Sequence, residues 1–178
     1  MNLVNIPSPV HTSESNDCAI CATQYVCQWF GIPEDRTEIK RLSKWSANSG
    51  ACPPLEWLHK FGLVTPGWYC KGLDTTPDPD RPGVLLQLPT PENQDRLFAA
   101  YQEQLATGAI GLATVMIPAG CHEVVVIHAE PQTGNLWVVC SLRGLYKTHK
   151  SEFFAGPNGR LRGGAVWWVR RQAVSVAS

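Results

Sequence analysis

The chain has 178 residues, 44% of them apolar, which suits a globular protein with a sizeable core and argues against disorder. Fifteen basic residues balance fifteen acidic ones and no basic run occurs, so nothing in the sequence indicates a nucleic-acid partner. We predict one domain over residues 1–178, with a helical half at 1–73 and a mainly β half at 84–178.

The N-terminal segment, MNLVNIPSPVHTSE, has neither the basic start nor the continuous apolar run of a signal peptide. No apolar run elsewhere approaches the ~18 residues that span a bilayer, so no membrane segment is expected. The seven cysteines are odd in number. Together these features favour reduced thiols in a cytoplasmic protein over a disulfide framework, and delivery elsewhere as an effector stays open.

Helices are predicted in the first part of the chain. Residues 19–30 follow three good N-cap residues, are apolar on every side and end at Gly31, which is typical of a buried helix. A second helix begins after Pro33 and the acidic pair that follows it, and a third lies near residues 55–61. The Pro/Asp-rich segment 74–83 marks the change from helices to strands.

The second part of the chain is predicted to be mainly β. A helix over about 91–107 interrupts it, and residues 131–134, PQTG, predict a hairpin turn. β-branched runs predict strands at 84–88, 111–117, 123–129, 135–141 and 163–170. Helices first and an antiparallel sheet second predict the α+β class.

Three cysteines lie in the first predicted helix, and they differ in their distance from its start. Cys18 sits in the first turn, where unpaired N–H groups and the helix dipole stabilise an anion and would lower the pKa of a thiol. Cys21 and Cys27 lie too far along to gain this. We therefore favour Cys18 as a nucleophile. Three alternatives stay open: buried packing for all three, a Cys-x-x-Cys redox pair of Cys18 and Cys21, and a zinc site.

A nucleophilic thiol needs a base, and His122 is the best placed of the five histidines. It directly precedes the apolar strand EVVVI, and strand ends beside a buried helix are where a base from distant sequence can meet a nucleophile. His128 lies at the far end of the same strand, where a structural role is the commoner one. We expect no cofactor and no metal.

The order of these features resembles papain-like cysteine peptidases, in particular the peptidase domains of bacteriocin-processing ABC exporters, which cut leader peptides after a double glycine. In that family Asp-Cys opens the first helix and an aromatic pair plus Gly closes it, as do Asp17-Cys18 and residues 29–31 here. The later motifs follow in order as PLEWLHKFGL, CHEVVVIHA, PQTGN, LWVVCSLRG, KSEFF and GGAVWWVR, and residues 89–110 resemble an insertion. The resemblance implies a papain-like fold, in which a buried nucleophile helix packs on a C-terminal antiparallel sheet.

This resemblance also implies roles for individual residues. Cys18 and His122 match the catalytic pair. The family's oxyanion-hole Gln falls on Thr12, with Asn16 nearby and Asp17 as a supporting residue, and the Asp that orients the histidine falls on Cys140, or on Ser141 if the alignment slips by one. Two of the four catalytic positions are therefore altered.

Two hypotheses of different classes follow. The first is a cysteine hydrolase, a peptidase or an amidase or deamidase, in which Cys18 and His122 act on a peptide or protein substrate through an acyl-enzyme. The second is a catalytically degenerate papain-like module that binds peptides. The retained Cys18 and His122 favour the first, and the altered Gln and Asp positions favour the second.

Overall fold

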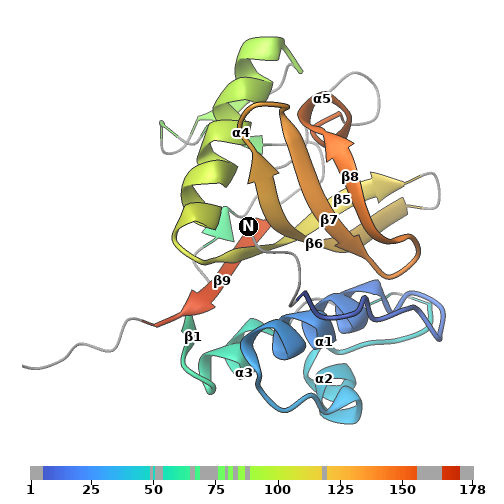
Figure 1. Cartoon of the computed structure of the whole chain (residues 1–178). Helices are drawn as coiled ribbons and strands as arrows, with labels where there is room; N and C mark the ends of the chain where they lie inside the picture. The colour runs from blue at the N-terminus through green and yellow to red at the C-terminus, as the bar shows by residue number, and fades with distance from the viewer. Residues whose placement is uncertain are drawn as a thin grey trace, which may run out of the picture.

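The computed structural model of the chain describes residues 6–48, 50, 54–64, 67–68, 76–78, 80–81, 84–86, 89–117, 120–155 and 166–172. Cys52, Cys70 and the loop 74–75 therefore lie outside the described residues, as do parts of the predicted strands 84–88 and 163–170. In the described ranges an antiparallel sheet lies between two groups of helices (Figure 1).

The helices below the sheet in Figure 1 come from the first part of the chain. They are α1 (Cys18–Phe30), α2 (Arg36–Leu42) and α3 (Leu55–His59). α1 ends where Gly31 adopts the left-handed conformation, with φ of 61°, and its N–H bonds back to the last turn. α2 begins at the N-cap Asp35, whose carboxylate accepts hydrogen bonds from the next turn. The helices predicted from the sequence are thus present.

The sheet is built mainly from the second part of the chain. Its order over the described residues is β1-β9-β5-β6-β7-β8, all pairs are antiparallel, and β2 also pairs with β9. The long strands are β5 (Ile110–Ile117), β6 (Gly120–Glu130), β7 (Asn135–Cys140), β8 (Gly144–His149) and β9 (Val166–Arg171), and the short ones are β1 (Leu63–Val64) and β2 (Gly67–Trp68). A separate pair is formed by β3 (Thr76–Pro77) and β4 (Leu85–Leu86).

Two further helices cover the other face of the sheet (Figure 1). α4 (Pro91–Ala106) begins at the N-cap Thr90, with proline in its first turn, and α5 (Lys150–Phe153) is a single turn. Tyr101 of α4 lies at the centre of this layer, with edge-on ring contacts to Phe153, Phe154 and Trp168. These contacts tie the helix at 91–106 to the sheet.

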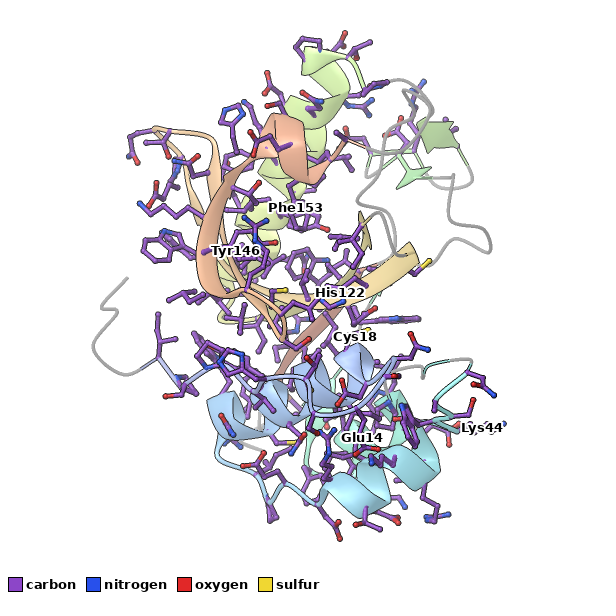
Figure 2. All side chains as sticks on the ribbon, turned by 90° about the vertical axis from the view of Figure 1, so that its right-hand side faces the viewer. Glu14, Cys18, Lys44, His122, Tyr146 and Phe153 are labelled. Carbon is purple, nitrogen blue, oxygen red and sulfur yellow. The ribbon has the colours of Figure 1, made fainter. Side chains whose placement is uncertain are left out.

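Strand alternation divides the apolar core into two clusters. Val124 and Val126 of β6 pack with α4 and α5, whereas Val125 and Ile127 pack with α1 to α3. α1 contributes apolar residues from every turn, so it is buried against the sheet as its composition predicted. The first residues of β6 lie next to the start of α1 (Figure 2), and the candidate site is found there.

Candidate active site

Cys18 is the first residue of α1 and its side chain is half-buried. In Figure 2 it lies beside the start of β6, directly below His122. Burial raises the pKa of the Cys18 thiol, and the negative charges of Glu123 and Asp17 add to that rise; backbone hydrogen bonds from Glu123 and Ala19 act in the opposite direction. The expected lowering of this pKa at the helix start is therefore wrong for the protein without substrate, because desolvation outweighs the N-terminal backbone groups.

The other two cysteines of α1 lie deeper in the core, as predicted. Cys21 and Cys27 are buried, and burial raises their pKa values to about 11 and about 12. The thiol of Cys21 donates to the carbonyl of His11 at 3.5 Å, and the guanidinium of Arg36 lies 3.9 Å from its sulfur. Both thiols are thus less ready to ionise than an exposed cysteine.

His122 is buried, and its Nε2 lies 3.2 Å from Sγ of Cys140. The backbone N–H of Leu142 donates to the same sulfur at 3.4 Å. Burial lowers the pKa of His122, which favours the neutral form of the imidazole. The structure therefore brings His122 and Cys140 together, and among the described residues it shows no hydrogen bond between His122 and Cys18.

Neighbouring side chains of β6 point to opposite faces of the sheet. His122 is paired with Val115, which packs with the α4 and α5 layer, and Cys140 belongs to that same core. Glu123 instead lines a small cavity with Cys21 and Tyr25 of α1. Cys18 thus lies next to two titratable residues of β6, with Glu123 facing the α1 side and His122 facing Cys140.

The segment before α1 carries the three residues predicted to support the site. The backbone N–H of Thr12 donates to the carbonyl of Ser141 at 3.2 Å, which places this segment beside the end of β7. The amide of Asn16 donates to the carbonyl of Ala47 at 2.6 Å. Thr12 is therefore close to the His122–Cys140 side of the site, while Asn16 is hydrogen-bonded to the connection between α2 and α3.

Asp17 is the N-cap residue of α1, but its carboxylate makes no capping hydrogen bond to the helix. The fully buried side chain instead binds Arg36 at 2.6 Å and accepts the backbone N–H groups of Ser13 and Glu14, each at 3.1 Å. Arg36 was not identified from the sequence, because its partner lies 19 residues away. This ion pair holds the segment before α1 in place.

The described residues contain neither a cluster suited to a metal ion nor a membrane-spanning helix. No group of three or more His, Cys, Asp or Glu side chains among them is arranged to hold a metal ion, and no helix in the described ranges is long and apolar enough to cross a membrane. Cys18 and Cys21 are both free thiols in this structure.

Comparison with known proteins bears on the fold. No protein-family model matches the sequence, and no curated protein matches it. Among solved structures, the peptidase domain of Streptococcus ComA, a bi-functional ABC transporter involved in a quorum sensing pathway, superposes with a TM-score of 0.59 at 15% identity. The match covers 92% of this chain and 97% of that one. The chain has the α+β fold of a papain-like peptidase domain, which confirms the predicted fold class and resemblance.

Proposed function

We propose that this protein is a papain-like cysteine hydrolase, a peptidase or an amidase or deamidase, with Cys18 as nucleophile and His122 as its base. The observation that carries the proposal is the position of Cys18, half-buried at the N-terminal end of α1 against the first residues of β6. Nucleophile and base then come from the two elements that a papain-like fold brings together. The similarity in fold to a peptidase domain over most of the chain supports the same assignment.

The chemistry would proceed through an acyl-enzyme. Sγ of Cys18 attacks the carbonyl carbon while its proton passes to the neutral imidazole of His122. The C–N bond breaks as His122 returns that proton to the leaving nitrogen. Water then attacks the thioester with His122 as base, and the carboxylic acid and free thiol are released. Unpaired N–H groups at the start of α1 are suited to stabilise the oxyanion.

The residue beside His122 bears on the rate of this reaction. Cys140 takes the place of an orienting carboxylate, so the imidazolium formed during attack has a cysteine sulfur 3.2 Å from its Nε2 where a carboxylate would stand. In a serine triad, replacing the orienting Asp with Asn costs ~10⁴ in rate. We therefore expect a slow enzyme, or one in which the substrate supplies part of the alignment.

A second candidate function is a peptide-binding module without catalysis. The raised pKa of Cys18 and the thiol at position 140 favour it, because neither promotes a reactive thiolate. In that case the protein would bind a peptide without cleaving it, and Cys18 would be a packing residue.

One experiment separates the two. The protein would be incubated with a mixed peptide library, and new termini and deamidated side chains would be counted by mass spectrometry. We expect products with the parent protein and with Cys21→Ala, the matched control for a thiol of the same helix, and none with Cys18→Ser or His122→Ala. Products that persist in Cys18→Ser would refute the nucleophile, and retention of peptides without any product would favour the binding module.

A further inference from the structure

Glu123 is a buried carboxyl group that the proposed reaction does not use. Its side chain is 8% exposed and lies on the α1 side of β6. Thr114, the residue opposite on β5, donates its hydroxyl to the carboxyl at 2.9 Å. No ion pair to a lysine, arginine or histidine of the described chain accompanies it. Such a group is costly to ionise unless it has a charged partner.

Among the described residues, several titratable groups surround Glu123 and no cation is paired with it. α1 presents Cys18, Cys21 and Tyr25. The preceding segment presents Asp17, whose charge is balanced by Arg36. The hydroxyls of Tyr25 and Ser141 on the cavity wall are buried and make no hydrogen bond with described residues. On the opposite face lie His122 and Tyr101, and burial together with the charge of Glu123 raises the pKa of Tyr101.

Glu123 and Cys18 are coupled by position. The backbone of Glu123 hydrogen-bonds to the sulfur of Cys18, and the negative charge of its carboxylate disfavours a second negative charge on that sulfur. Like charges that share a buried site do not ionise together. The Cys18 thiol therefore meets either a neutral neighbour or an anionic one, depending on a single proton.

We propose that Glu123 is a positioning residue that acts on the Cys18 thiol through its charge, so that the thiolate forms more readily while Glu123 carries its proton than after it has lost it. Burial raises the pKa of Glu123 to about 7, so this change of charge falls near neutral pH. The inference rests on the proposed role of Cys18 as nucleophile. It adds that above about pH 7 the charge of Glu123 holds the pKa of Cys18 higher than a neutral neighbour would, so the thiolate fraction grows less with pH than it otherwise would.

The rate at which iodoacetamide alkylates Cys18 as a function of pH tests this proposal. Fragment-ion mass spectrometry would resolve Cys18 from Cys21 and Cys27. At pH 8, Glu123→Gln should be alkylated about tenfold faster than the parent, since removing one nearby charge lowers the pKa of a thiol by about one unit. At pH 6 the parent residue is itself neutral, so the two rates should converge. Equal rates at pH 8, or the same ratio at both pH values, would overturn the proposal.

Two further variants keep the test decisive. Thr114→Val removes the hydroxyl that favours the carboxylate, so Glu123 stays protonated to higher pH and Cys18 should react faster than in the parent between pH 7 and 8. This variant decides the matter if Glu123→Gln does not fold. Glu130→Gln is the matched control, because Glu130 lies on the same strand and binds Lys147 at the surface; it should leave the profile unchanged.

The alkylation assay needs no substrate, so its outcome is independent of hydrolysis. If the ratio of the two alkylation rates depends on pH but the protein hydrolyses no peptide, the coupling of Glu123 to Cys18 is supported and the proposed function is refuted. If hydrolysis depends on Cys18 but the ratio of alkylation rates is the same at every pH, only the coupling is refuted.

Discussion

The stability of the protein should depend on pH through Glu123, and the structure sets the size of the effect. Among the described residues, the Thr114 hydroxyl is the one side-chain hydrogen-bond partner of this buried carboxyl group, and burial raises its pKa from 4.5 to about 7. The unfolded chain releases this proton near pH 4.5, whereas the folded chain holds it up to about pH 7. The folded state therefore binds more protons in this window, and stability is lost as the pH rises through it.

The magnitude follows from the difference between the two pKa values. One pKa unit corresponds to 1.36 kcal/mol, so a difference of about 2.5 units predicts a contribution of about 3 kcal/mol that is present at pH 4.5 and gone at pH 8. Glu123→Gln keeps the shape of the side chain and an acceptor for Thr114, but it has no proton to lose. The free energy of unfolding of the variant should therefore increase relative to that of the parent as the pH rises.

Urea unfolding of the parent and of Glu123→Gln at several pH values between 4.5 and 8 measures this. The quantity of interest is the difference in the free energy of unfolding between the two proteins at each pH, because His122 and other groups contribute equally to both. That difference should move by about 3 kcal/mol in favour of the variant from pH 4.5 to pH 8. A difference that stays flat across the range would show that Glu123 is ionised in the folded protein and would refute its buried, neutral character.

Three further predictions concern the start of α1 and the His122 side of the site. Cys21→Ala should cost ~1 kcal/mol in urea unfolding through lost packing and leave Cys18-dependent hydrolysis intact. Arg36→Ala leaves the fully buried carboxylate of Asp17 without its cation and should cost about 2 kcal/mol by the same assay, part of which Asp17→Asn in that background should restore. Cys140→Asp should raise the pKa of His122 by about one unit or more, read from its NMR signals during a pH titration, and an unchanged value would show that position 140 does not orient the imidazole.

The sequence was informative where local signals decide the structure. α1 was predicted to within one residue at its start, because a run without Gly or Pro lies between cap residues and Gly31. The hairpin between β6 and β7 was predicted from PQTG, and Gly134 in that turn adopts φ of 71°. In both cases the deciding residues lie within the element itself or directly beside it.

Elements at the edge of the sheet were missed. β8 was not predicted, because its residues alternate between half-buried and exposed and carry Lys147 and Thr148 among apolar neighbours. α5 is four residues long, too short for a periodic pattern to show. β8 is held mainly by its pairing with the preceding strand β7, whereas α5 is held by contacts to a distant part of the chain, such as the packing of Phe153 against Tyr101.

The electrostatics of the site depended on burial more than on position in the helix. The start of a helix favours a thiolate, yet Cys18 is raised in pKa because the sheet desolvates it and two carboxyl groups lie nearby. The alternation of EVVVI could have revealed one of these groups, since Glu123 shares a face with Val125 and Ile127, which pack on α1. The ion pair between Asp17 and Arg36 has no such local signal in the sequence, because the two residues are 19 positions apart.

These features together describe how the proposed pair would rest before substrate binds. Burial raises the pKa of Cys18 and lowers that of His122, and the side chain 3.2 Å from Nε2 of His122 is the cysteine at position 140 and not a carboxylate. Arg36, the cation next to this segment, is already bound to Asp17. Both shifts disfavour a preformed pair of thiolate and imidazolium. In the proposed hydrolase His122 would act as a general base at the moment of attack, so the proton transfer and the formation of the C–S bond would belong to the same step.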